Sequence, residues 1–119
     1  DVLIPQVYFG FENEAAPFSE TVTEWVQTVT CDSVSLVIGI GTHKYGKVDQ
    51  WAGSGSMEWT TQWDLPVRQA TQVLETDGTD GLAVYDYATT FLPESNAERM
   101  AQQVEQLGAL LRGMPADPL

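Results

Sequence analysis

The segment that decides the fold is Val34-Ser35-Leu36-Val37-Ile38-Gly39-Ile40-Gly41, an apolar run of strand length. Similar runs lie at residues 2–9 and 81–87, and each of the three is followed by polar and aromatic residues and then by an amphipathic helical pattern. Strands and helices that alternate in this way are typical of βα units that build a parallel sheet. We therefore predict an α/β fold of three consecutive βα units, with the functional residues at the carboxyl ends of the strands.

Local signals predict where the strands and helices begin and end. Pro5 removes one backbone donor from the first strand, which indicates an edge position or a local irregularity. The second helix is expected to start at the capping residue Asp64, with Pro66 in its first turn. After a loop at residues 88–93, Ser95 and Glu98 stand at the spacing of a capping box for the third helix.

The length of the chain limits the number of domains. At 119 residues it is one domain or less, far below the ~250 residues of a complete eight-fold βα barrel. It also begins at Asp1, almost directly in a strand and without a Met. We interpret residues 1–119 as a single segment of a longer polypeptide, and a self-contained small α/β protein is the alternative.

The composition disfavours several kinds of partner and site. A formal charge of −12 leaves no basic surface for nucleic acid or an anionic membrane, and no apolar stretch approaches the ~20 residues of a membrane span. Cys31 is the single cysteine, expected as a buried or half-buried thiol, and His43 is the single histidine. Neither a disulfide nor a multi-histidine metal site can be assembled from them, and we expect no metal or cofactor. A nucleotide site at Gly39-Ile40-Gly41 is rejected because Lys44 stands where the dinucleotide fingerprint needs a third Gly.

Polar residues surround the predicted end of the first strand. Gln6 and Tyr8 alternate onto one face of the strand, and Glu12 and Glu14 follow in the adjoining loop. Glycoside hydrolysis normally uses two carboxyl groups, one as acid and the other as base or nucleophile. Glu12 and Glu14 are therefore candidate catalytic residues, and plain solvent-facing glutamates are the alternative.

A long excursion, residues 42–63, follows the second strand. Ordinary βα connections take ~2 to 6 residues, so a connection of this length indicates a functional loop. Aromatic faces beside polar groups would suit the faces and hydroxyls of sugar rings, whereas a small satellite core under the loop is the alternative. The candidate substrate-binding residues here are His43, Lys44, Tyr45, Asp49, Trp51 and Trp59.

A third carboxylate lies at the end of the third strand. Asp86 stands between Tyr85 and Tyr87, where the strand would reach the mouth of a βα barrel. Its position is compatible with a catalytic role or with the orientation of a neighbouring Lys or Arg.

Several of these segments together resemble a known family. The segments are Pro5 to Glu14, Gly39 to Lys47, Asp49 to Gly55 and Glu58-Trp59. They resemble the family-10 glycosyl-hydrolase-like proteins, bacterial glycosidases with a (β/α)8 barrel. The resemblance covers nearly the whole chain and implies that it spans strand 6 to helix 8 of such a barrel, a partial TIM barrel.

The resemblance implies a hydrolase that acts on a polysaccharide or a cell-wall glycan, outside a bacterial cell or in its envelope. Cleft residues implied by position are Gln6, Tyr8, Glu12, Glu14, Lys44, Asp49 and Asp86. In barrels of this type a principal catalytic carboxylate often comes from strands 1 to 5. Because this chain lacks them, we expect it to be inactive alone and to need the missing amino-terminal part of the barrel as a partner.

Two other readings stay open. One is a barrel segment that binds carbohydrate or acts as a scaffold without catalysis, and the other is a small flavodoxin-like protein. Right-handed crossovers place all three helices on one face of the sheet and leave the other face uncovered. An exposed apolar face promotes association, so we expect a homo-oligomer if the chain is isolated.

Overall fold

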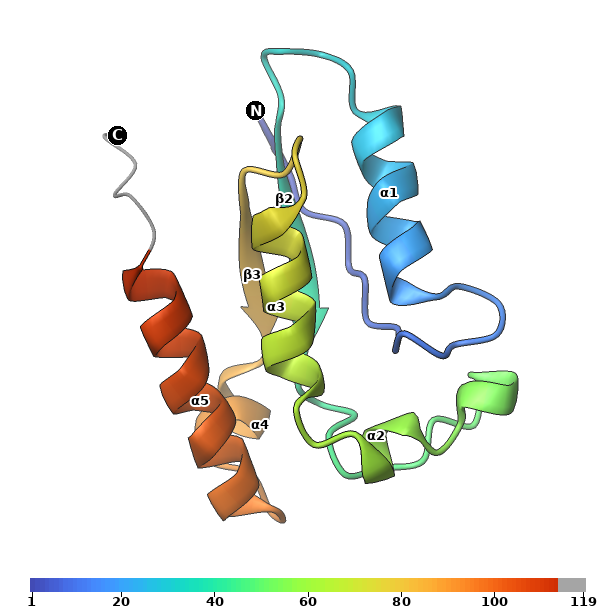
Figure 1. Ribbon diagram of the computed structural model, residues 1–119, viewed down its shortest axis with the longest axis vertical. Coiled ribbons are helices and arrows are strands. Elements are labelled where there is room, and N and C mark those ends of the chain that lie inside the picture. Colours follow the sequence, from blue (N-terminus) through green and yellow to red (C-terminus); the bar gives the residue numbers. More distant parts are fainter. Residues whose placement is uncertain (114–119) are drawn as a thin grey trace.

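The structure is a computed structural model that describes residues 1–113, and it has the predicted α/β architecture. Its three strands form one parallel sheet in the order β1-β2-β3 (Figure 1). The strands are β1 (Val2–Leu3), β2 (Ser35–Gly41) and β3 (Gly81–Tyr85). The helices are α1 (Phe18–Thr28), the 3-10 turn η1 (Gly53–Gly55), α2 (Glu58–Thr61), α3 (Leu65–Glu75), α4 (Tyr87–Phe91) and α5 (Ala97–Arg112).

The main core lies between one face of the sheet and the three long helices. Alternate residues of β2, namely Leu36, Ile38 and Ile40, are buried against apolar side chains of α1, α3 and α5. In Figure 1, α3 lies against the sheet between α1 and α5. Since side chains alternate along a strand, Val37, Gly39 and Gly41 face the opposite side of the sheet.

The first strand is shorter than predicted. β1 ends at Leu3, the chain is irregular at Ile4 and Pro5, and pairing returns as a single bridge between Gln6 and Gly39. Pro5 still accepts a hydrogen bond from the Gly39 N–H at 2.9 Å, but it has no N–H to donate. The predicted run is therefore two short pairing segments that keep the parallel direction.

Two helix starts differ from the sequence signals. Asp64 is the N-cap of α3, but its side chain caps no backbone N–H and lies 3.7 Å from Arg68 instead. The capping box at Ser95 and Glu98 is wrong, because α5 starts at Ala97 after Asn96, which adopts a left-handed φ of 58°. Among residues 1–113, no helix combines the length and the apolar character that crossing a membrane requires.

The loop predicted at residues 88–93 is partly helical. Asp86 accepts a hydrogen bond from the Thr89 N–H and caps α4 directly after β3. The expectation of a buried Cys31 is also wrong, since this thiol lies in the exposed turn before β2 and contacts the Ser33 hydroxyl at 3.0 Å. The sequence pattern near a helix end does not reveal whether a thiol in the following turn is buried or exposed.

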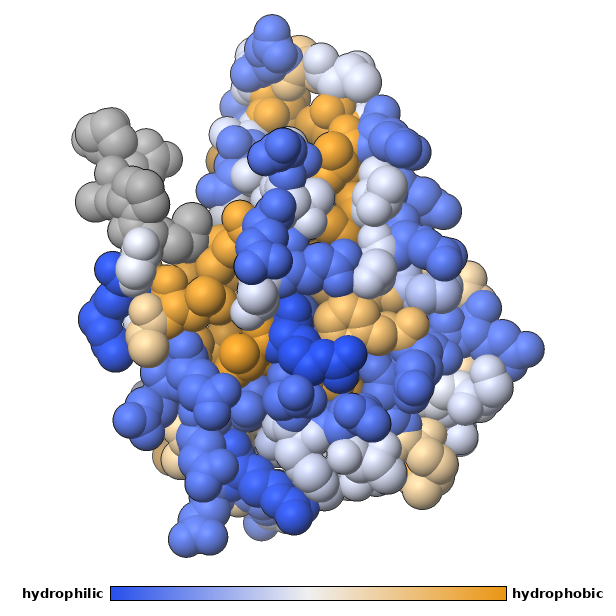
Figure 2. Space-filling view, in the orientation of Figure 1, coloured by the Kyte–Doolittle hydropathy of each residue, from blue (hydrophilic) through white to orange (hydrophobic). Residues whose placement is uncertain are grey.

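Apolar side chains remain exposed at both edges of the sheet. At the β1 edge, Val2 and Ile4 are 61% and 51% exposed. Beside β3, an apolar groove runs between α4 and α5, with Val84, Phe91 and Leu111 in its lining. Figure 2 shows apolar surface over the C-terminal part of α5 and on both sides of α3.

Candidate functional site

Three aromatic rings meet at the carboxyl edge of the sheet, one from the end of each strand segment. Tyr8 stacks on Tyr85 with ring centroids 5.4 Å apart, and His43 packs edge-on against Tyr8 at 5.1 Å and against Tyr85 at 5.3 Å. We call Tyr8, His43 and Tyr85 the strand-end cluster. Because the strands are parallel, their ends converge on one edge, which is where ligand sites of α/β folds lie.

Gly41 makes room for this cluster. It pairs with Tyr85 in the β2–β3 register and carries no side chain. A Cβ atom at Gly41 would lie 2.7 Å from the His43 ring and 3.1 Å from the Tyr8 ring. The glycine at the end of β2 therefore lets the two rings approach the sheet.

The surroundings of His43 and Tyr8 shift the pKa of each ring in the direction that favours its uncharged form. Burial, followed by the neighbouring Lys44 cation, lowers the pKa of His43. The Nδ1 atom of His43 is buried and has no hydrogen-bond partner among the described residues. Burial, followed by the adjacent Tyr85 and Asp86, raises the pKa of Tyr8. Neutral rings with polar atoms suit a ligand that is partly apolar and partly hydroxylated.

Asp86 lies beside the cluster as a held carboxylate. It accepts hydrogen bonds from both the hydroxyl and the backbone N–H of Thr89, the latter at 3.0 Å. These bonds hold the pKa of Asp86 below its ordinary value, so the group stays ionised. An ionised carboxylate accepts hydrogen bonds but supplies no proton, which makes Asp86 an acceptor or base rather than an acid.

The hydroxyl of Thr42 ties the loop after β2 to the loop after β3. The Thr42 backbone N–H donates to Tyr85 O at 2.6 Å, and Thr42 Oγ1 lies 2.8 Å from the hydroxyls of both Thr89 and Thr90. Thr42 and Thr90 are buried. This connection fixes the position of the two loops that flank the cluster.

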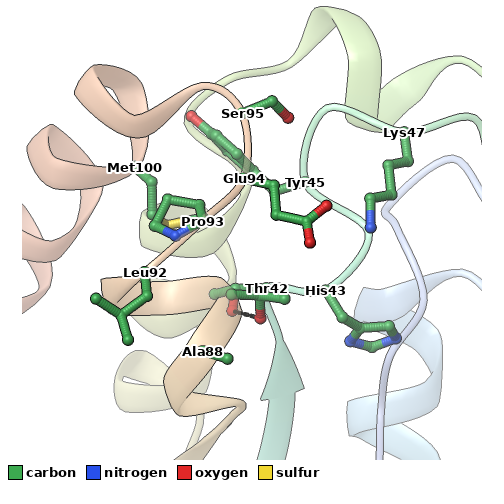
Figure 3. Close-up of a pocket in the computed structure, with 11 residues that line it drawn as sticks. Thr42, His43, Tyr45, Lys47, Ala88, Leu92, Pro93, Glu94, Ser95 and Met100 are labelled. Atoms are coloured by element: carbon green, nitrogen blue, oxygen red, sulfur yellow. Dashed lines mark hydrogen bonds between the residues drawn. The ribbon is translucent and has the colours of Figure 1, made fainter.

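A pocket of about 240 Å³ opens between these two loops (Figure 3). We call it the loop pocket. Lys47 comes from the loop after β2, Glu94 comes from the loop after α4, and both side chains extend toward the hollow. The pocket is lined by Thr42, His43, Tyr45, Lys47, Ala88, Thr89, Leu92, Pro93, Glu94, Ser95 and Met100.

The side chains of Glu12 and Glu14 make no hydrogen bond to the strand-end cluster among the described residues. Glu14 accepts a hydrogen bond from the Ser54 N–H at 2.9 Å, and the Glu12 side chain is exposed. The carboxylate of Glu58 is buried and accepts the backbone N–H groups of Phe11 and Glu12 at 2.8 and 2.7 Å. Within residues 1–113, no hydrogen bond or ion pair joins Glu12 or Glu14 to the strand-end cluster.

Lys44 and Asp49 form an ion pair that supports the end of the first strand. The Lys44 ammonium lies 2.9 Å from Asp49 and donates to Tyr8 O at 2.6 Å. Asp49 is buried and also accepts the Trp51 N–H at 3.2 Å. Both side chains are thus engaged within the protein, and they position Tyr8 rather than face open solvent.

The aromatic residues of the excursion fall into two groups. Tyr45 and Trp59 are buried with Leu65 and Met100 in a second core cluster, and the Tyr45 hydroxyl donates to Trp63 O at 2.6 Å. Trp51, in contrast, is 81% exposed. The satellite core is therefore present under the excursion, while Trp51 and the exposed Gln6 remain free to contact a ligand.

Tyr85, Lys47, Glu94 and Thr89 join the site but are not among the residues predicted from the sequence. For Tyr85, the available signal is its place at a strand end next to Asp86. Among residues 1–113, no group of three His, Cys, Asp or Glu side chains could hold a metal ion.

Comparisons with known proteins identify no relative. No family model, curated protein or solved structure matches the chain. The interpretation of the site consequently depends on its geometry and chemistry.

Proposed function

We propose that the chain is the carboxyl-terminal part of a (β/α)8 barrel of the glycoside-hydrolase type, and that its strand-end cluster binds carbohydrate. The substrate would be a polysaccharide or cell-wall glycan outside a bacterial cell. The observation that carries this proposal is the convergence of Tyr8, His43 and Tyr85 beside Asp86 at the carboxyl ends of consecutive parallel strands. In βα barrels this edge holds the active site.

The chemistry of the cluster suits a sugar. Tyr85 is 49% exposed, so its ring offers an apolar surface for the C–H face of a pyranose. Asp86 offers an ionised acceptor for hydroxyl groups, and bonds of this charge-assisted kind are roughly twice as strong as neutral ones. The sheet order supports the barrel reading over the flavodoxin-like one, because flavodoxin-like sheets place the first strand between the second and third.

Hydrolysis would require a further group from outside this chain. A glycosidase needs a carboxylic acid that is protonated at the working pH. The pKa of Asp86 is lowered, and the Glu58 carboxylate, whose pKa burial raises, is occupied by two backbone N–H groups. We infer that the chain binds glycan and that the missing amino-terminal part of the barrel supplies the acid.

A non-catalytic carbohydrate-binding segment is the second candidate. It is favoured by the engagement of Glu14 with the Ser54 N–H, which gives this candidate catalytic residue a structural task. The two candidates separate on the full-length parent, where Glu12→Gln or Asp86→Asn abolishes turnover in an enzyme and only alters affinity in a binding protein.

The open edges of the sheet define the expected partners. In the parent, further strands would cover the exposed Val2 and Ile4 at the β1 edge and the groove beside β3. In their absence we propose that copies of the chain associate through these surfaces. Light scattering at micromolar concentration tests this, and a monomeric mass with a cooperative thermal transition would contradict it.

Calorimetric titration with soluble oligosaccharides tests the binding proposal. Tyr85→Ala removes a ring of the cluster, whereas Tyr87→Ala removes a neighbouring ring that is 71% exposed on α4 and packs on Phe91. We expect at least tenfold weaker binding for Tyr85→Ala and little change for Tyr87→Ala. Equal effects of the two changes would count against the cluster as the binding surface.

A further inference from the structure

Lys47 and Glu94 carry opposite charges into the loop pocket from two different loops. Both side chains are exposed, and neither belongs to the ion pairs within residues 1–113, which join Lys44 to Asp49 and Arg68 to Asp64. Figure 3 shows both side chains extending toward the space between the loops. A donor and an acceptor that face the same hollow without pairing are available to a ligand that can serve both.

We propose that the loop pocket is a subsite for one uncharged sugar ring, whose neighbouring hydroxyls bind Lys47 and Glu94. This inference rests on the proposed function and assigns a second contact region of the same glycan. One hydroxyl donates to the Glu94 carboxylate, and the oxygen of the adjacent hydroxyl accepts from the Lys47 ammonium. Each bond involves one charged partner and is stronger than a bond between neutral groups.

The pocket is small and suits a single ring. Its volume of about 240 Å³ lies below the ~300 to 1,000 Å³ that sites for drug-sized ligands occupy. Leu92, Pro93 and Met100 supply apolar lining, against which the C–H face of a pyranose can pack. The pocket therefore combines an apolar surface with two charged hydrogen-bonding groups, the combination that a sugar ring requires.

The local charges disfavour ionic ligands. Phosphate or carboxylate would be repelled by Glu94. An ammonium group would be repelled by Lys47. A ring whose polar groups are hydroxyls satisfies both charges without adding one of its own.

The pocket is continuous with the strand-end cluster. His43 lines the pocket and also packs against Tyr8 and Tyr85. A glycan that lies on the cluster can thus place its next sugar unit, or a branch, in the pocket. The structure predicts that Lys47 and Glu94 contribute to affinity only for ligands long enough to reach both regions.

Calorimetry on two near-isosteric variants tests the subsite. The probes are cello-, xylo- and chito-oligosaccharides of two to six units, and the variants are Lys47→Met and Glu94→Gln. Glu98→Gln, at an exposed position in the first turn of α5, is the matched control. For the longer ligands that bind the wild type, we expect about tenfold weaker binding to Lys47→Met and to Glu94→Gln. We expect the control Glu98→Gln to bind with the affinity of the wild type.

Methionine methyl NMR reads the pocket directly. Met100 lines the pocket, whereas Met57 is 52% exposed in the excursion and serves as an internal reference. We expect the methyl signal of Met100 to shift with the oligosaccharide and that of Met57 to stay in place. Inorganic phosphate is titrated in parallel, and a Met100 shift with phosphate alone would overturn the neutral-ring assignment in favour of an anion site.

The outcomes separate this inference from the proposed function. If Lys47→Met and Glu94→Gln bind like the wild type while Tyr85→Ala binds weakly, the subsite is wrong and the strand-end cluster stands. If the wild type binds none of the oligosaccharides, both are wrong.

Discussion

Two regions of the molecule carry carboxylates next to backbone turns, and they use them differently. In the β1–α1 loop and its surroundings, Glu58 and Glu14 accept backbone N–H groups of neighbouring loops. At the end of β3, Asp86 also caps a helix, but it lies beside the exposed ring of Tyr85, and Glu94 faces an open pocket. Carboxylates thus stabilise the fold in one region and face a potential ligand in the other.

The largest expected effect concerns Glu58, whose buried carboxylate stabilises the fold. Glu58→Ala leaves the N–H groups of Phe11 and Glu12 without their acceptor. Because hydrogen bonds to a charged group contribute about 1.5 to 3 kcal/mol each and the buried charge is removed with them, we expect a loss of about 3 kcal/mol in unfolding free energy. Urea denaturation measures it.

Glu12→Ala is the control for that experiment, since the Glu12 side chain is exposed and the substitution keeps the backbone N–H that donates to Glu58. We expect a change within about 0.5 kcal/mol. If the two variants lost the same stability, the distinction between a fastening and a solvent-facing carboxylate would fail.

The second prediction concerns the buried ion pair. Asp49→Ala leaves the Lys44 ammonium without its partner and releases Tyr8 O from a well-placed donor. Removal of one partner of a buried pair is strongly destabilising, and since Lys44 is partly exposed we expect about 2 kcal/mol. The Tyr8 ring should move with it, so near-ultraviolet circular dichroism of the variant should change as well. An unchanged spectrum would mean that Lys44 does not position Tyr8.

The third prediction uses pH on the Asp86 side of the comparison. Because the folded pKa of Asp86 is depressed, its contribution to stability is present above the ordinary carboxyl pKa of about 4 and is lost as pH falls through the folded value. Asp86→Ala should therefore melt below the wild type at pH 7, and the two should converge in acid. A difference in melting temperature that is independent of pH would contradict the capping role.

The smallest effect concerns the environment of His43. Its folded pKa is lowered, so between that value and about 6.5 the unfolded chain binds more protons and stability rises with pH. Gly41→Ala places a Cβ against the ring and should push it toward solvent, which returns the pKa toward its ordinary value. Proton NMR of this single histidine measures both proteins, and an unchanged pKa in the variant would show that Gly41 does not set the ring position.

The sequence carries the fold at the level of periodicity. The apolar runs and helical stripes predict the three βα units, because burial imposes those patterns. They do not predict α4, which the hydrogen bonds between Asp86 and Thr89 cap at its start. Nor do they predict that α5 starts directly after Asn96 rather than at a capping box, since that start depends on the left-handed conformation of Asn96.

The site is predictable only in part. Tyr8 and His43 follow from their positions after strands, because strand ends converge whatever the details of the loops. Glu14 also follows a strand, but its carboxylate accepts a hydrogen bond from the Ser54 N–H, which belongs to a loop distant in the sequence. No local sequence pattern marks Glu94 as a site residue. It lines the same pocket as Lys47 only because two separate loops pack together through Thr42.

A single titration shows which of the two carboxylate regions contacts the ligand. The ring proton of His43 and the backbone amides of Glu12 and Ser54 are followed by NMR while oligosaccharide is added to the wild-type chain. The account predicts that the His43 signal shifts in a saturable way while the two amides hold their positions. Saturable shifts at Glu12 and Ser54 with an unmoved His43 would contradict it and place the binding surface at the β1–α1 loop.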